Sequence, residues 1–184
     1  MVAYYYFDFR DTAKQDVRGL LSSLVVQLGA KSDLCCDILS RLYSKHDAGL
    51  RLPDDDALTQ CLQDMLQHPR QPPIYVIVDA LDECPNSSGA PSLRELVLDL
   101  IENLVELHIP NLRICVTSRP EADIQEALGP LVSSSVSLHE EAGQKQDVMD
   151  YIDSTVQLDR KMRKWRAEDR QLVIDALTQR ADGM

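Results

Sequence analysis

An uncharged run of apolar residues, 74–78, is the feature that most restricts how this chain can fold. The run is mostly β-branched, leads directly into Asp79, and is typical of a strand covered on both faces of a parallel sheet. Residues 112–117 (LRICVT) predict the next strand, and residues 3–9 are rich in aromatic side chains, which favours a third strand. Helical periodicity separates the three runs. Because parallel strands joined through helices form right-handed crossovers, the pattern predicts an α/β fold with a mainly parallel sheet.

Several other segments have apolar residues three and four positions apart, as amphipathic helices require. They predict helices over residues 17–28, 34–45, 56–67, 92–104, 121–128, 145–156 and 166–180, and a weak strand over residues 135–138. The acidic run 54–56 comes at the start of one of these helices, where carboxylates stabilise the N-terminus, so we interpret it as a cap and not as a metal site. Ser92 and Glu95 have the spacing of a capping box.

Composition and charge argue against several classes of function. The 184 residues include 19 Lys and Arg against 30 Asp and Glu, which gives a net charge of −11. Nucleic acid is therefore not an expected partner, since affinity for it comes mostly from Lys and Arg. No apolar run approaches the roughly 20 residues that cross a bilayer, and the first residues do not form a signal peptide, so we expect no membrane partner and a cytoplasmic location. The 5 cysteines lack C-x-x-C spacing and predict reduced, mostly buried thiols, and the 4 separated histidines offer no zinc site.

Acidic residues follow the uncharged strand at the point where ligands gather in parallel sheets, the carboxyl end. Asp79 ends the strand, and Asp82 and Glu83 come shortly after it. One carboxylate in this position can hold Mg²⁺, often through water, and a second can polarise an attacking water as general base. The alternative is an ordinary acidic turn in which Asp79 acts as a cap.

Polar residues also follow the predicted strand at 112–117. The hydroxyl groups of Thr117 and Ser118 can orient water or a γ-phosphate, and Arg119 can neutralise phosphate charge. The alternative is an ordinary strand exit that Pro120 terminates. We expect the two strands to lie side by side, with Asp79 and Arg119 facing one shared rim.

The segments IYVIVDALDECP and LRICVTSRPE closely resemble the Walker B and sensor-1 segments of NACHT-type P-loop NTPases, members of the STAND group of signalling proteins. The opening VAYYYFDFRD, followed by RGLLSSLVVQL, looks like the second strand and helix of fungal NACHT proteins with a nephrocystin-3-like N-terminal domain. The resemblance covers nearly the whole chain. It implies a three-layer P-loop NTPase-like parallel sheet with helices on both faces, used as an ATP- or GTP-dependent switch that controls oligomerisation and signalling.

By this resemblance each candidate residue receives a role. Asp79 is the Mg²⁺-linked acid, Asp82 and Glu83 are the acidic pair that includes the catalytic base, and Arg119 is the sensor arginine. The residues alone do not decide between Asp82 and Glu83 as the base, nor between ATP and GTP as the nucleotide.

The chain departs from the family pattern because it contains no G-x-x-x-x-G-K-[ST] loop, and its 7 glycines are not clustered. We therefore expect residues 1–184 to be a partial domain in which the phosphate-loop strand is missing. Mg²⁺ with ATP or GTP is expected to bind the complete domain and not to bind tightly to this chain alone. The expected partners are the remainder of its own NACHT domain, flanking repeat or effector domains, and further copies of itself. An unpaired strand edge inside such a sheet predicts marginal stability for the isolated chain.

Other functions fit the sequence less well. Asp82-Glu83-Cys84-Pro85 resembles the DExx box of helicases, but the apolar strand leads to Asp79 and the net charge is acidic. A DxD phosphatase needs two acids two positions apart at a strand end, and Asp79 and Asp82 are three apart. A nucleotide-free protein-interaction module or an inactive truncated gene product remains the alternative. The basic residues between 160 and 166 are flanked by acids, and we interpret them as a solvated surface that connects two helices.

Overall fold

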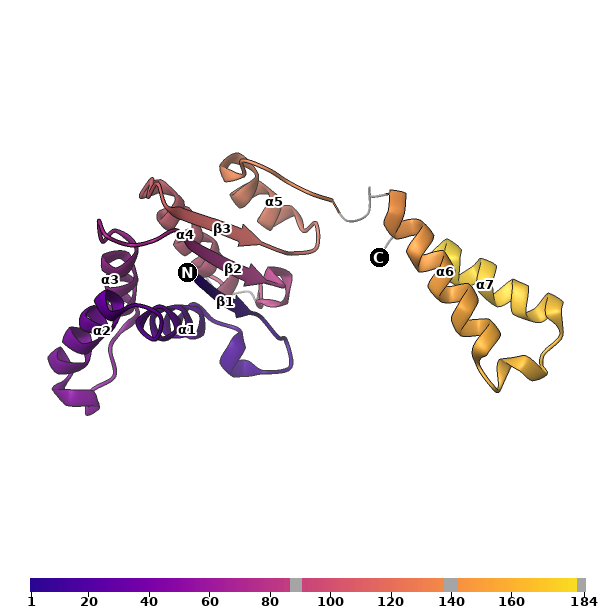
Figure 1. The fold of residues 1–184 in the computed structure, drawn as a ribbon, viewed down its shortest axis with the longest axis horizontal. Coiled ribbons are helices and arrows are strands. Elements are labelled where there is room, and N and C mark those ends of the chain that lie inside the picture. Colours follow the sequence, from indigo (N-terminus) through magenta and orange to yellow (C-terminus); the bar gives the residue numbers. More distant parts are fainter. Residues whose placement is uncertain (87–90, 138–141, 182–184) are drawn as a thin grey trace. The chain divides into compact units, whose positions relative to one another are not determined.

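The computed structural model describes residues 1–86, 91–137 and 142–181 (Figure 1). It is an α/β structure with a three-stranded parallel sheet and seven α-helices in these ranges, which confirms the predicted fold class. The chain forms two compact units, residues 1–132 and residues 133–184. The sheet lies in the first unit.

The sheet has the order β1-β2-β3, with β1 over Val2–Tyr6, β2 over Ile74–Asp79 and β3 over Leu112–Val116. All pairs are parallel, and Val76 lies beside Ala3 on one side and Ile114 on the other. The arrowheads in Figure 1 accordingly point the same way. The two strands that carry the candidate residues are therefore neighbours, as predicted.

The first strand is shorter than the sequence predicts, and the reason lies in residues 8–10. The ladder continues as far as Phe7, whose N–H donates to the Asp79 carbonyl at 3.0 Å. Asp8 then accepts the N–H of Arg10 at 2.9 Å and also binds the Arg10 guanidinium. An aspartate that binds the backbone two residues ahead forms a turn, so the chain leaves the sheet here.

Helices in the first unit begin and end within a few residues of the predicted positions. They are α1 at Val17–Gly29, α2 at Asp33–Lys45, α3 at Asp55–Leu66, α4 at Leu93–Glu106 and α5 at Ala122–Leu128. Asp54 caps α3, since its carboxylate accepts the Ala57 N–H at 2.8 Å, and the capping box of Ser92 and Glu95 is present. Both capping predictions are confirmed. The sequence PNSSGAP at residues 85–91 predicts a loop before α4, and its residues 87–90 lie outside the described residues.

One face of the sheet is packed and the other is exposed, within the described part of residues 1–132. Ala3, Tyr5, Val76 and Val78 are buried in one core with the apolar sides of α1, α3 and α4. The alternate side chains point the other way and remain partly exposed, with Val2 at 43%, Tyr4 at 54%, Tyr6 at 45% and Tyr75 at 50%.

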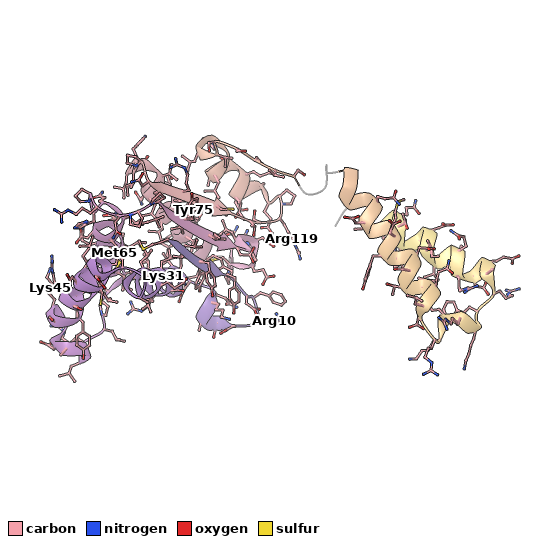
Figure 2. All side chains as sticks on the ribbon, viewed as in Figure 1. Arg10, Lys31, Lys45, Met65, Tyr75 and Arg119 are labelled. Carbon is pink, nitrogen blue, oxygen red and sulfur yellow. The ribbon has the colours of Figure 1, made fainter. Side chains whose placement is uncertain are left out.

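This one-sided packing follows from the strand order. Three sequential parallel strands joined by right-handed crossovers place their connecting helices on the same face. We expected β2 to be covered on both faces and helices to lie on both faces of the sheet. Within this unit, helices cover one face only. Tyr75, labelled in Figure 2, belongs to the exposed face.

The two outer edges of the sheet differ in their hydrogen bonding. The Gln27 amide binds both the N–H and the carbonyl of Tyr4, at 3.1 and 2.6 Å, and the Lys31 ammonium binds the Val2 carbonyl. Side chains of α1 and the following residues thus occupy the free edge of β1. At the other edge, the Thr117 N–H donates to the Val78 carbonyl, and the Ile74 N–H donates to the Asn111 carbonyl. The backbone N–H and carbonyl groups of the odd-numbered residues around β3 therefore face β2. The backbone of Ile114 and Val116 therefore faces outward, and no described residue binds it from that side.

The second unit is a pair of helices, α6 over Ala142–Leu158 and α7 over Ala167–Ala181. Both were predicted, whereas the weak strand is absent from residues 135–137, and Leu138 lies outside the described residues. Val156 is buried, but Tyr151, Leu158 and Leu172 are more than half exposed. The basic residues at 160–166 are mostly exposed and lie between the helices, as predicted. Across the described ranges, none of the helices combines the length and apolar character needed to span a membrane.

Candidate functional site

The candidate residues lie together where the three strands end. Asp79 is exposed at the last position of β2, and the Thr117 hydroxyl donates a hydrogen bond to its Oδ1. Figure 2 shows Arg119 and Arg10 at the end of the first unit toward which the strands run. The carboxyl ends of adjacent parallel strands thus present Asp79 and Arg119 at one rim, as the sequence predicts.

Thr117 also shapes the turn that follows Asp79. Its Oγ1 accepts the Ala80 N–H at 3.0 Å, and its carbonyl accepts the Leu81 N–H at 3.0 Å. Ala80 has φ 54, a left-handed conformation that is costly for a residue with a side chain. The contacts of Thr117 hold the backbone in this conformation, so β3 determines how the chain leaves β2.

Asp82 lies in a one-turn 3-10 helix, Leu81–Glu83, and its side chain is only 9% exposed. The carboxylate Oδ1 accepts the backbone N–H of Arg119 at 3.0 Å, and Oδ2 lies 3.5 Å from the Arg119 guanidinium. The Arg119 side chain is itself 81% exposed and extends into solvent. The Ser118 hydroxyl donates to the Arg119 carbonyl at 2.8 Å. Asp82 therefore anchors the segment after β3, and the Arg119 guanidinium, although it pairs with Asp82, is exposed enough to meet an anion as well.

Glu83 faces the loop after β1. Its Oε2 accepts the Phe9 N–H at 3.2 Å, and the next residue, Cys84, donates its thiol to the Gln15 carbonyl at 3.2 Å. The acidic turn at residues 81–84 thus binds the loop after β1 through Glu83 and Cys84, and binds the segment after β3 through Asp82. All three strand ends are connected through this turn.

Arg94 is a site residue that the sequence analysis missed. It lies in the first turn of α4 and is only 5% exposed. Its guanidinium donates to the carbonyls of Cys84 and Asp82, at 2.9 and 2.7 Å, and pairs with the carboxylates of Glu121 and Asp123. Burial alone would lower the pKa of Arg94, but the hydrogen bonds that its guanidinium donates to the carboxylates of Glu121 and Asp123 outweigh that effect, and its pKa is raised.

These segments enclose a shallow hollow of about 380 Å³. It is bounded by Phe9 and Gln15 from the loop after β1, by residues 82–85, and by Arg119 and Glu121. Within the described residues there is no group of three or more His, Cys, Asp or Glu side chains placed to hold a metal by themselves.

The Cys84 thiol gives a direct test of this packing. Burial raises its pKa to about 11, and Asp16 adds to the shift although Arg94 opposes it. Because the thiolate is the reactive species, we expect iodoacetamide at pH 8 to modify the exposed Cys36 and Cys115 well before Cys84. Mass spectrometry of the time course measures this order, and denatured protein, in which all thiols should react alike, is the control. Equal rates at Cys84 and Cys36 in the folded chain would contradict the buried position.

Comparison with known proteins shows the family. Searches of curated proteins and of solved structures find no match to this chain. The sequence model of the family described as Nephrocystin 3, N-terminal, matches residues 1–119, which span all three strands and end at Arg119. Since the match covers well over half of the sequence, the chain belongs to the Nephrocystin 3, N-terminal, family.

Proposed function

We propose that this chain is part of a NACHT-type nucleotide-dependent signalling switch of the STAND group, in which the ends of β2 and β3 form one side of a site for Mg²⁺ with ATP or GTP. One observation carries the proposal: Asp79, the acidic turn and Arg119 converge at the carboxyl ends of neighbouring parallel strands. This is the edge of an open α/β sheet at which ligands bind. Membership of the family adds support.

The surroundings of Asp79 fit a magnesium ion. Its Oδ1 accepts the Thr117 hydroxyl, while no described residue donates a hydrogen bond to Oδ2. Mg²⁺ keeps several waters and takes one or two protein carboxylates, so one exposed carboxylate that is held in place by a neighbour suits it. When bound, the ion would neutralise charge on the nucleotide phosphates. Thr117 would then act by orienting Asp79.

Glu83 is the better candidate for the general base, a choice that the sequence leaves open. Asp82 is almost buried, and its oxygens are directed to the Arg119 backbone and guanidinium. Glu83 is half-buried beside the hollow and binds only the Phe9 N–H among the described residues. A base must reach a water and take its proton, which a carboxylate with an available oxygen can do. Asp82 would then position the segment after β3.

Arg119 and Ser118 divide the remaining roles. The exposed Arg119 guanidinium can bind a phosphate oxygen, and the Asp82 carboxylate beside it sets the direction of the side chain. The Ser118 hydroxyl is directed to the Arg119 carbonyl, so we infer that it supports Arg119 and does not contact the nucleotide directly. The sequence prediction gave both Thr117 and Ser118 a possible contact with phosphate, and we now propose no such contact for Ser118.

The surfaces left uncovered in the first unit support the idea of a larger domain. The backbone of Ile114 and Val116 faces outward on β3, and Tyr4, Tyr6 and Tyr75 are exposed on one face of the sheet. The chain also lacks a glycine-rich loop that would surround a triphosphate. We infer that the remainder of the NACHT domain supplies the phosphate loop beside β3. Flanking repeat or effector domains, and contacts between copies of the protein, would then respond to the bound nucleotide. We also infer that the complete protein acts in the cytoplasm.

Nucleotide binding by two proteins tests this proposal. Fluorescent ATP and GTP analogues are titrated, with and without Mg²⁺, into this chain and into the longest product of its gene that includes a glycine-rich phosphate loop. We expect no tight binding to the chain alone and Mg²⁺-dependent binding, in the micromolar range, to the longer protein. Failure of both to bind, or the absence of such a loop from the gene, would favour a nucleotide-free interaction module or an inactive gene product.

A further inference from the structure

Arg94 connects two parts of the candidate site that are distant in sequence. Its guanidinium donates to the carbonyls of Asp82 and Cys84, the residues before and after Glu83 in the sequence. It also donates to the carboxylates of Glu121 and Asp123. The segment between β3 and Asp123 carries Thr117 and Arg119. No other described side chain hydrogen bonds to the turn at residues 81–84 and to residues 121–123 together.

The chemistry of these contacts requires an arginine. A planar guanidinium donates in several fixed directions, and here Nε, Nη1 and Nη2 are each used. A lysine at the same position would keep the positive charge but would reach only some of the acceptors. Each lost donor would leave a carbonyl or carboxylate without its partner in a site where Arg94 is 5% exposed.

We propose that Arg94 is a positioning residue that couples the acidic turn to the segment after β3, so that Glu83 and Arg119 change position together. The inference rests on the proposed function for its catalytic consequence, but the coupling is a property of this chain by itself. Because Arg94 lines the hollow and donates hydrogen bonds to two carbonyls of the turn, displacement of the segment at 117–123 would be transmitted to the carboxylate of Glu83. In the complete switch, a bound phosphate that attracts the Arg119 guanidinium would thereby also shift the position of the Glu83 carboxylate.

Hydrogen exchange of the full chain tests the coupling without nucleotide. The amides of Glu83 and Cys84 report on the turn, and those of Leu81 and Arg119 report on its bonds to the segment after β3. In Arg94→Lys we expect both groups to exchange about tenfold faster or more, the effect of losing one hydrogen bond to a charged group. Arg18→Lys is the matched control, since Arg18 similarly binds Asp55 and the Pro53 carbonyl but hydrogen bonds to no described residue of the turn or of the segment 117–123. Faster exchange in the turn alone, or equal acceleration in the Arg18 variant, would overturn the proposal.

Steady-state kinetics of the longer, nucleotide-binding protein test the consequence. Arg94→Lys should lower kcat about 10- to 100-fold, as expected when a catalytic group is misplaced by a fraction of an ångström to an ångström, and should change KM by less than about threefold. Arg18→Lys should leave both unchanged. An unchanged kcat in Arg94→Lys would contradict the positioning role. If the wild-type protein hydrolyses no nucleotide, the proposed function fails, and the exchange experiment alone decides the coupling.

Discussion

Replacing Glu83 with glutamine is expected to lower nucleotide hydrolysis by the longer protein about 100- to 10,000-fold, the range that general base catalysis contributes. Glutamine has no proton-accepting carboxylate, yet its amide oxygen can still accept the Phe9 N–H that Glu83 Oε2 binds at 3.2 Å. The loop after β1 should therefore keep its position, and binding of Mg²⁺ with nucleotide should be retained. Phosphate release and nucleotide titration on the same preparation measure the two effects.

Asp82→Asn is the matched control for this prediction. Asparagine keeps an oxygen for the Arg119 N–H but removes the charge that faces the Arg119 guanidinium. We expect a reduction in turnover of about tenfold or less, since the turn is weakened and the base is retained. Loss of hydrolysis in the Asp82 variant with normal turnover in the Glu83 variant would exchange the two roles.

Phe7→Ala is expected to produce the largest loss of stability, about 3–5 kcal/mol. Phe7 is only 2% exposed and packs edge-on against Tyr5, with ring centroids 5.0 Å apart and an interplanar angle of 81°. Its backbone N–H also binds the Asp79 carbonyl. Removing the ring leaves a cavity in the core, which the surrounding side chains can fill only in part. Urea unfolding of the chain, followed by circular dichroism, measures the change in free energy.

Two variants check that the lost packing causes this effect. Phe7→Leu keeps most of the apolar volume and should cost roughly 1–2 kcal/mol. Phe9→Ala removes the same ring two residues later, where it is 66% exposed, and should change the free energy of unfolding by about 0.5 kcal/mol or less. A similar stability for all three variants and the wild type would show that β1 does not pack into the core as described.

The sequence predicts the arrangement of the site because its signals are local. The uncharged strand and the polar residues at its end place Asp79, and the similar segment after β3 places Thr117 and Arg119. Right-handed crossovers then make the two strands neighbours, which the register of β2 and β3 confirms. The side chains meet because parallel strands end at one edge of a sheet.

Other features of the site depend on contacts that no local pattern contains. Arg94 binds residues 82, 84, 121 and 123, and helical periodicity counts an arginine as a surface residue. One feature of the sequence did indicate a special role for Arg94. A cation in the first turn of a helix is unfavourable because it opposes the helix dipole, so an arginine there is expected to make compensating contacts. The exposed face of the sheet was mispredicted for a similar reason. An apolar run indicates that a strand is buried under other elements, but it does not say on which face. The order of the strands decides which face of the sheet the connecting helices pack against.

Magnesium-dependent binding to the longer protein and to its Asp79→Asn variant tests the central claim most directly. Asparagine can still accept the Thr117 hydroxyl at Oδ1, so the turn should be preserved while the charge that would hold the ion is lost. Calorimetric titration with ATP and GTP should show that Mg²⁺ strengthens binding to the wild type and that this gain falls about tenfold or more in Asp79→Asn. An equal gain from Mg²⁺ in both proteins would contradict the assignment of this strand end as the metal side of a nucleotide site.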